Sequence, residues 1–363
     1  MRFGFVVAIL VHIAVLASVV ERGHEPTVVV RESTTPVSLN VPITINAAPL
    51  PEPATGVIKA ACPPPRTDAP RASTLHPPRE VVQVTTSRTN AGWIAAWSDT
   101  TIYVSTDAGV TFDQVLDGPG SVDAVTFDCF GTVVAVRDGQ LGMRSGTREQ
   151  WRDLPRGLRG NEDDPSALIG GGPDVIVIGI APSDDWQARL AVSSDLGETW
   201  WYRDLVPYWE SSHASGTQTA DGAIDVVLTT ADCMSDPVYW SRIRNGKVAT
   251  ESLGSIGTTL LAKGIAYRAW PTLQWQAFGE DTWHPITGVP DDAALVDGAT
   301  PHAISNGTVY RLARGKATRV VTWGERDAPT EIDPAGRLWG IRETIDGESA
   351  WAIAVDRNSS SED

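Results

Sequence analysis

The sequence predicts an all-β protein, and three features support this fold class. Short runs rich in Val, Ile, Thr and Trp alternate with polar residues and are interrupted every few positions by Gly, Asp, Asn or Pro, which is typical of strands joined by tight turns. The 363 residues include 33 Gly, 25 Pro and 14 Trp, a high content for this length. Helical spacing of apolar residues is almost absent beyond the N-terminus.

One sequence motif occurs twice, as VSTDAGVTF at residues 104–112 and as VSSDLGETW at residues 192–200. Each copy is a short apolar run followed by Ser-x-Asp-x-Gly-x-Thr and an aromatic residue. The motif positions are Ser105, Asp107, Gly109, Thr111, Phe112, Ser193, Asp195, Gly197, Thr199 and Trp200. Halving the spacing of the two copies gives a period of about 44 residues, and a degenerate copy, MRSGTREQW, lies between them at 143–151. A more divergent copy, FGEDTWHPI, follows at 278–286.

Strands placed around these copies divide the chain into units of about 40 residues. The expected units cover residues 81–118, 121–160, 165–206, 211–254, 257–290, 291–323 and 327–357. Each unit holds about four short strands, and such units are the blades of a β-propeller. The sequence favours seven blades, with six as the alternative.

The repeated motif resembles the Asp-box, or BNR repeat, of the sialidase-like β-propeller superfamily. The resemblance implies that each copy forms the turn between the third and fourth strands of a blade, with the Asp carboxylate accepting backbone N–H bonds. Gly109 and Gly197 would adopt the positive φ that other residues resist. Phe112 and Trp200 would pack between neighbouring sheets. The role implied for the motif is structural.

The residues do not support the catalytic function of that superfamily. Sialidases of the family that the motif resembles carry an arginine in a Phe/Tyr-Arg-Ile-Pro motif near the first blade. The nearest strings here, YRAWP at 267–271 and WSRIRN at 240–245, lie far along the chain. No catalytic residue is assigned, no CxxC or HExxH metal motif occurs, and no cofactor is expected. A binding or scaffold function is favoured, and a divergent glycoside hydrolase or lyase is the alternative.

The N-terminus predicts export from the cytoplasm. Residues 3–20 are apolar except for His12 and Ser18, which predicts a signal peptide or an N-terminal membrane anchor over residues 1–20. Cleavage and retention of this segment are both left open, and either places the rest of the chain in an extracytoplasmic (periplasmic or secreted) location.

The rest of the chain divides by composition. Residues 21–78 hold 12 of the 25 prolines, which predicts a linker, and VSLNVPITIN at 37–46 could form an edge strand within it. The propeller is expected at 79–357 and a disordered tail at 358–363.

The charge of the chain restricts its partners. The formal net charge is −16, and residues 79–363 alone carry 23 basic and 40 acidic residues, a net of −17. An acidic body repels phosphate backbones, so nucleic-acid binding is disfavoured. We expect a monomer that meets the membrane only through its N-terminal segment.

A ligand site is expected on the face opposite the repeated turns, between the third and fourth blades. Three long segments with aromatic and acidic residues converge there, at 156–165, 181–187 and 207–216. The candidate binding residues are Glu162, Asp184, Asp185, Trp186, Tyr208, Trp209, Glu210 and His213. Exposed rings among carboxylates suit a peptide, a protein or a glycan.

Closure of the ring and the pairing of the cysteines can also be predicted. The last unit offers only three strand-like runs, APTEID, RLWGIRE and SAWAIAVD, so an N-terminal strand from 27–46, or otherwise from 79–87, is expected to complete it. Cys129 and Cys233 are expected in different blades and at opposite faces, and therefore not bonded to each other.

Overall fold

The computed structural model describes the part of the chain that forms the repeated units. The described residues are 61–67, 81–155, 158, 167–180, 187–205, 213–219, 222–229, 237–255, 259–262, 264–269, 272–298, 300–322, 331–343 and 350–352. All of them belong to the compact unit of residues 49–363. No helix long and apolar enough to cross a membrane occurs within these ranges.

Six groups of four antiparallel strands follow one another along the chain, and the sixth group is part of a six-stranded sheet. The first comprises β1 (Gln83–Thr86), β2 (Ile94–Trp97), β3 (Ile102–Ser105) and β4 (Asp113–Val115). The second comprises β5 (Val122–Phe127), β6 (Val133–Arg137), β7 (Gln140–Ser145) and β8 (Arg148–Asp153). The third comprises β9 (Ala167–Ile169), β10 (Val175–Ile180), β11 (Ala188–Ser193) and β12 (Trp201–Asp204).

The other three sheets repeat this order. The fourth comprises β13 (His213–Gln218), β14 (Ile224–Thr229), β15 (Pro237–Arg244) and β16 (Lys247–Ser255). The fifth comprises β17 (Thr259–Ala262), β18 (Ile265–Arg268), β19 (Gln274–Ala277) and β20 (His284–Pro285). The sixth comprises β21 (Ala294–Gly298), β22 (His302–Ser305), β23 (Thr308–Ala313) and β24 (Lys316–Thr322).

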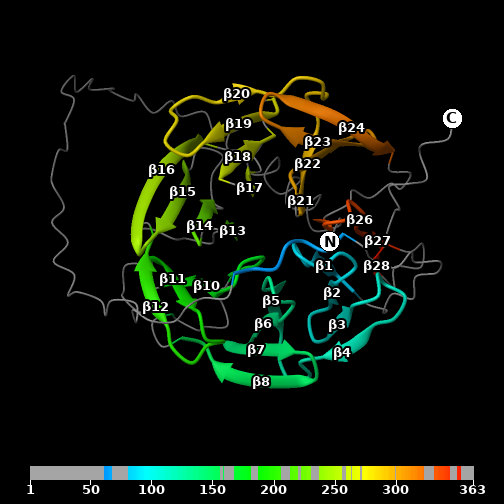
Figure 1. Cartoon of the computed structure of the whole chain (residues 1–363), viewed down its shortest axis with the longest axis vertical. Coiled ribbons are helices and arrows are strands. Elements are labelled where there is room, and N and C mark those ends of the chain that lie inside the picture. Colours follow the sequence, from blue (N-terminus) through cyan, green and yellow to red (C-terminus); the bar gives the residue numbers. More distant parts are fainter. Residues whose placement is uncertain are drawn as a thin grey trace, which may run out of the picture. The chain divides into compact units, whose positions relative to one another are not determined.

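The sheets are arranged in a ring, as Figure 1 shows. The first strand of each sheet contacts the first strand of the next, from β1 through β5, β9, β13 and β17 to β21. Four short strands then follow, β25 (Glu331–Ile332), β26 (Leu338–Trp339), β27 (Ile341–Glu343) and β28 (Ala350–Ala352). β25 pairs in parallel with β21 and also contacts β1, so the chain returns to its first sheet.

The observed sheets match the expected units closely. The first six units each contain one four-stranded sheet, so six four-stranded blades of a propeller are present. The expected strand RLWGIRE at 337–343 is divided at Gly340 into β26 and β27. The suggestion that 79–87 completes the last unit is wrong, because β1 pairs with β2 inside the first blade. Residues 27–46 lie outside the described residues.

The apolar core lies between neighbouring blades. One cluster joins Ile178 and Leu190 of the third blade to Val226 and Leu228 of the fourth, all of them buried. Strands with apolar residues on both faces, such as VIVIGI in β10, suit a blade that is covered on both sides. Each blade is therefore held in place by its two neighbours.

The order of the strands gives the ring two different faces. Turns that join the first strand to the second, and the third to the fourth, lie at one face, which we call the lower face. Connections from the second strand to the third, and from one blade to the next, begin and end at the opposite, upper face.

Candidate functional site

The two Ser-x-Asp-x-Gly-x-Thr turns have the same hydrogen bonds. They connect β3 to β4 and β11 to β12, at the lower face. In each, the Thr N–H donates to Asp Oδ1 at 2.9 Å and the Thr hydroxyl to Oδ2 at 2.6 Å, for Asp107 with Thr111 and for Asp195 with Thr199. The Ser hydroxyl donates to the same Asp at 2.8 Å in both turns. The carboxylate thus closes the turn.

The serine and glycine complete these two turns. Ser105 Oγ accepts the Gly109 N–H at 2.8 Å, and Ser193 Oγ accepts the Gly197 N–H at 2.7 Å. The two glycines have φ of 83° and 81°, where a β-carbon would be strained. Trp200 packs against a buried cluster that includes residues of the second and third blades.

The hydrogen bonds also set the charge state of the two carboxylates. Burial raises the pKa of Asp107 and Asp195, but the bonds from Thr111 and Thr199, from the backbone and from the serines outweigh it. The pKa of each carboxyl is therefore lowered, and both remain ionised as acceptors.

The degenerate copies occupy the same place in their blades. MRSGTREQW covers the turn between β7 and β8, and FGEDTWHPI covers the turn between β19 and β20. The second of these is bound to the preceding blade, because Glu251 of β16 accepts the Gly279 N–H at 2.8 Å and Trp283 donates to the Leu253 carbonyl at 3.3 Å. These contacts join the outer parts of adjacent blades.

A second repeated turn, which was not predicted from the sequence, joins the first and second strands of a unit. In Asp128-Cys-Phe-Gly-Thr132, the Asp carboxylate accepts the N–H groups of Phe130 and Thr132 at 2.9 and 2.7 Å. In Asp333-Pro-Ala-Gly-Arg337, the carboxylate likewise accepts the Arg337 N–H at 2.9 Å, and it also pairs with the guanidinium at 2.8 Å. The spacing Asp-x-x-Gly at corresponding positions of two units is the signal that could have identified it.

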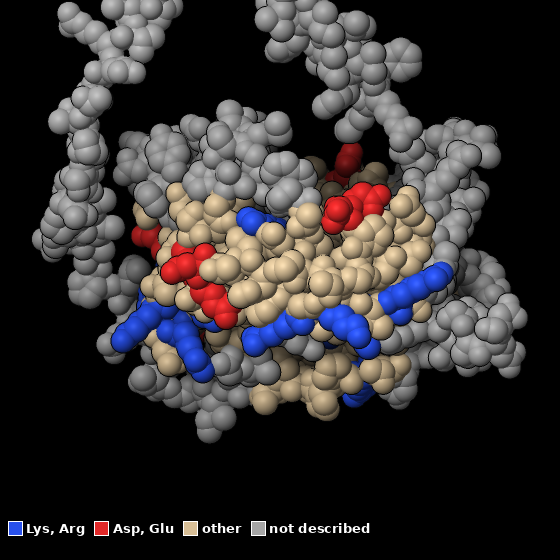
Figure 2. All heavy atoms as spheres, turned by 90° about the horizontal axis from the view of Figure 1, so that it is seen from above, with Lys and Arg blue, Asp and Glu red and all other residues tan. Residues whose placement is uncertain are grey.

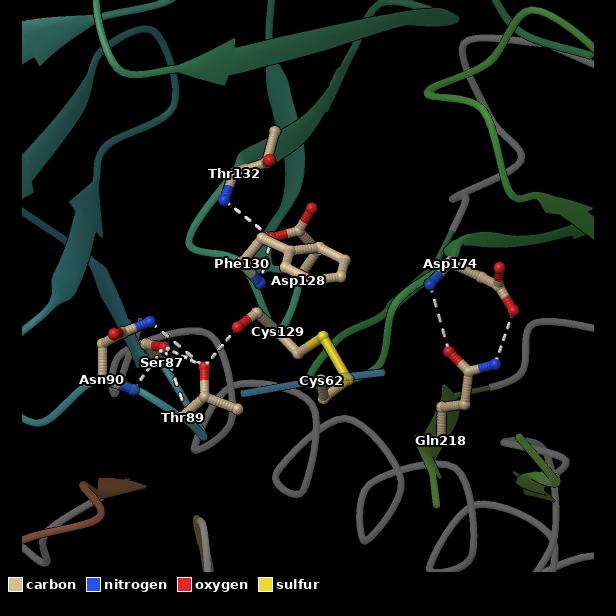
Figure 3. The surroundings of a disulfide bond; sticks show 10 residues. All are labelled: Cys62, Ser87, Thr89, Asn90, Asp128, Cys129, Phe130, Thr132, Asp174 and Gln218. Atoms are coloured by element: carbon tan, nitrogen blue, oxygen red, sulfur yellow. Dashed lines mark hydrogen bonds between the residues drawn. A yellow bond between two sulfur atoms is a disulfide. The ribbon is translucent and has the colours of Figure 1, made fainter. Parts of the chain in front are cut away.

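Residues 61–67, which we call the N-terminal strap, are bound to the lower face. Cys62 forms a disulfide with Cys129 in the β5–β6 turn, with 5.5 Å between the Cα atoms (Figure 3). Arg66 exchanges backbone hydrogen bonds of 2.7 and 2.9 Å with Thr89 and Ala91 in the β1–β2 turn. Because Cys129 is bonded to Cys62, the prediction that it is not bonded to Cys233 is confirmed, although Cys233 itself lies outside the described residues. Part of the expected linker is bound to the propeller.

Polar side chains near the strap link the first blade to the second and the third blade to the fourth at the lower face. The Thr89 hydroxyl donates to the Cys129 carbonyl at 3.0 Å, between the first and second blades (Figure 3). Gln218 donates to Asp174 Oδ2 at 2.6 Å and accepts the Asp174 N–H at 3.2 Å, between the fourth and third blades (Figure 3). The strap therefore lies in an ordered polar network.

An ion pair connects the two ends of the ring. Arg88, just after β1, donates to both carboxylate oxygens of Asp297 in β21 at 3.0 Å. Glu331 lies next to Asp297 in the parallel β21–β25 pairing and accepts weak bonds from Thr85 and Thr86 at 3.5 and 3.4 Å. The first blade, the sixth blade and the last strands thus meet in one cluster, which we call the closure cluster.

The closure cluster contains two carboxylates and one guanidinium. Burial, and then the charge of Asp297, raise the pKa of Glu331 well above its ordinary value, while Arg88 and the two threonine hydroxyls lower it by less. The attraction of Arg88 is therefore too weak to offset the effects of burial and of Asp297 on the pKa of Glu331.

Three consecutive glycines fill the middle of the lower face. A β-carbon on Gly170 would lie 1.9 Å from Thr126 Oγ1, one on Gly171 would lie 2.7 Å from Arg88 Cδ, and one on Gly172 would lie 2.0 Å from Gln218 Oε1. Thr126, Arg88 and Gln218 come from the second, first and fourth blades. The β9–β10 turn therefore has no room for side chains and is enclosed by three other blades.

The expected ligand site lies almost entirely outside the described residues. This applies to Glu162, Asp184, Asp185, Trp186, Tyr208, Trp209 and Glu210. The backbone of His213 begins β13 and pairs with Thr229. The strand ends that flank these segments, including those of β8, β10 and β12, are upper ends.

The described upper face is acidic. All the exposed charged side chains described there are aspartates, in the upper connections or at the upper ends of strands. They are Asp99, Asp117, Asp123, Asp138, Asp153, Asp291 and Asp292. Within the described ranges, no three His, Cys, Asp or Glu side chains come together as metal ligands would.

The fold defines a β-propeller, and comparison with solved structures agrees. The structure of U3-55K has a TM-score of 0.52 at 10% identity, covering 76% of this chain and 95% of that one. The WD40 repeats of RRP9 give 0.51 at 10% identity, covering 79% and 99%. The β-propeller domain of the Trilobed protease from Pyrococcus furiosus gives 0.46 at 10% identity, covering 77% and 99%. No family model matches the chain, and no curated protein matches it.

Proposed function

We propose that this protein is an exported or membrane-tethered propeller whose upper face binds a peptide, a protein or a glycan. One observation carries the proposal: the strand ends that flank the candidate binding segments lie at the face opposite the structural contacts. The lower face holds the hydrogen-bonded turns, the strap and the closure cluster. The segments with Trp186 and Trp209 leave strands at their upper ends.

Export is supported by the disulfide. Bonds such as Cys62–Cys129 persist in oxidising compartments and are rare in the cytosol. The apolar segment at residues 3–20 supplies a route out of the cytoplasm, whether it is cleaved or retained.

Membership of the sialidase-like Asp-box group is part of the proposal. Two turns with the predicted spacing, the same strand positions and matching hydrogen-bond distances support it. We also take β25–β28 as a seventh, incomplete blade. Its first turn, at Asp333, has the same carboxylate bond to the fifth residue as the turn at Asp128 in the second blade.

The proposed ligand site combines rings with carboxylates. Trp186 and Trp209 would stack on the ligand, and the other candidate residues would orient it, namely Glu162, Asp184, Asp185, Tyr208, Glu210 and His213. The exposed aspartates of the described upper face add negative potential around this region, which favours ligands with cationic or hydroxyl groups.

The test uses peptide and glycan arrays to identify a ligand. The double change Trp186→Ala with Trp209→Ala is expected to abolish binding of that ligand without lowering the melting temperature. Phe130→Ala is the matched control, because Phe130 is an aromatic ring 46% exposed on the lower face. Retained binding in the double variant would contradict the site, and cleavage of an arrayed glycan would support the carbohydrate-active alternative.

A further inference from the structure

Exposed basic side chains are confined to the lower face of the described structure. They lie in the strap or in the hairpins between third and fourth strands of the second, fourth and sixth blades. They are Arg66, Arg148, Arg244, Lys247, Arg311, Arg314, Lys316 and Arg319. Every exposed charged side chain described at the upper face is an aspartate, whereas the lower face combines these basic residues with exposed carboxylates at Asp113, Glu149, Glu198, Glu280 and Asp281.

The three basic hairpins have the same loop length. Each has a two-residue turn, with Ser145 paired to Arg148, Arg244 to Lys247 and Ala313 to Lys316. The first, third and fifth blades have longer, acidic turns instead, at 105–113, 193–200 and 278–283. Basic hairpins therefore alternate with acidic turns along the six blades.

The sixth blade has the highest concentration of basic residues. Its hairpin at 308–322 has four Lys or Arg residues and no Asp or Glu. Figure 2 shows most Lys and Arg side chains along the lower margin of the described surface, with acidic side chains above them. Two lower-face carboxylates are compensated, because Glu149 pairs with Arg144 at 3.4 Å and Glu198 pairs with Arg152.

We propose that the lower face rests on an anionic phospholipid surface, through the basic hairpins of the second, fourth and sixth blades. The proposal depends on the tethered form of the proposed function. The strap, which begins the described part of the chain at residue 61, is bound at this same face. With 40 residues between that segment and the strap, the tether does not by itself fix an orientation, and the charged hairpins supply it.

The negative net charge of the protein does not prevent this contact. At physiological ionic strength the Debye length is about 8 Å. Strands of four to six residues separate the two faces by about 13–20 Å, so the upper aspartates are screened from a surface that touches the hairpins. Juxtamembrane Lys and Arg are attracted to anionic lipid within this range.

The test compares two kinds of liposome that hold the same full-length protein. One is phosphatidylcholine alone and the other contains phosphatidylglycerol, and amide hydrogen exchange is measured for the hairpins and for the upper β2–β3 turn. We expect slower exchange at the three basic hairpins only with phosphatidylglycerol, and loss of that protection at high salt. Equal exchange in both lipids, or protection of the upper turn instead, would overturn the proposal.

Two triple variants make the test specific. The first variant should remove the slower exchange at the hairpins; it combines Lys247→Gln, Arg311→Gln and Lys316→Gln. The control lowers the net charge by the same amount at exposed upper positions, through Gln83→Glu, Thr100→Glu and Gln140→Glu, and should keep the protection.

Two further measurements distinguish a lipid surface from a soluble polyanion, and the lipid contact from the upper ligand site. If soluble polyphosphate without lipid protects the hairpins as well as phosphatidylglycerol does, the lipid assignment is overturned in favour of a polyanion. Array binding by the same variants reports the upper face separately, so a failed lipid contact leaves the proposed ligand site intact.

Discussion

At the scale of single residues, one carboxylate determines the form of each Asp-box-like turn. Asp107 and Asp195 each accept three hydrogen bonds within a stretch of seven residues, including both the N–H and the hydroxyl of the following threonine. An aspartate fits because both oxygens can accept while the short side chain stays beside its own backbone.

Asp195→Ala is expected to lower the free energy of unfolding by roughly 1–3 kcal/mol, because the Thr199 N–H and two hydroxyls lose their acceptor. Asp107→Ala should cost a similar amount, since its bonds have the same lengths. Urea denaturation monitored by tryptophan fluorescence measures the change. An Asp195→Ala protein with unchanged stability and lost ligand binding would contradict the structural role.

The sequence was informative where contacts are local. Ser193, Asp195 and Thr199 lie within seven residues, so their spacing alone predicted the turn. Arg88 and Asp297 are 209 residues apart, and nothing in the sequence indicates that they meet. The same holds for Cys62 and Cys129, because a proline-rich composition gave no reason to expect binding of the strap.

At the scale of elements, the lower face is consolidated by two segments without regular secondary structure. The strap joins the β1–β2 and β5–β6 turns by one disulfide and a pair of backbone hydrogen bonds. The three glycines at 170–172 allow the β9–β10 turn to pack against three other blades. Proline-rich and glycine-rich segments are usually flexible. Here the strap and the glycine turn are both ordered, because neighbouring blades enclose them.

Cys62→Ser is expected to destabilise the propeller. Opening a cross-link with a sequence separation of 67 residues releases chain entropy worth about 4 kcal/mol in the unfolded state. The measurement is the melting temperature with and without reductant. Reductant should lower it for the wild-type protein and for Cys233→Ser, but should have no further effect on Cys62→Ser. Equal melting temperatures of the wild-type protein and Cys62→Ser would contradict this prediction.

At the scale of the whole molecule, the repeat period predicted the blades well, but it did not predict how the ring closes. Six units with regular turns became six four-stranded sheets. The last unit has shorter strands, and its attachment depends on the β21–β25 pairing and on the closure cluster. The repeat period could not predict these contacts, because they occur once, between the first, sixth and last units, and are not repeated along the chain.

Ring closure should depend on pH through Glu331. Its folded-state pKa is raised, so the stabilising contribution of the protonated carboxyl is full below the ordinary value of 4.5 and is lost as pH rises through the folded value. Glu331→Gln, which resembles the protonated form, should flatten the fall in stability on the alkaline side of 4.5.

Denaturation midpoints across a pH series provide the measurement, with Glu280→Gln at an exposed turn as the control. Asp107 and Asp195 have lowered pKa values, so their contribution is lost at the acid end instead, as pH falls through their folded values. A Glu331→Gln protein with the wild-type pH profile would contradict the role of this side chain in closure.

The disulfide also bears on the order in which the propeller can assemble. The loop between Cys62 and Cys129 contains the whole first blade and the first strand of the second. In the exported form proposed above, passage across the membrane from the N-terminus would bring out both sulfurs before any later blade. The cross-link can therefore form early and hold the first blade in a closed loop, against which each later sheet is added in turn.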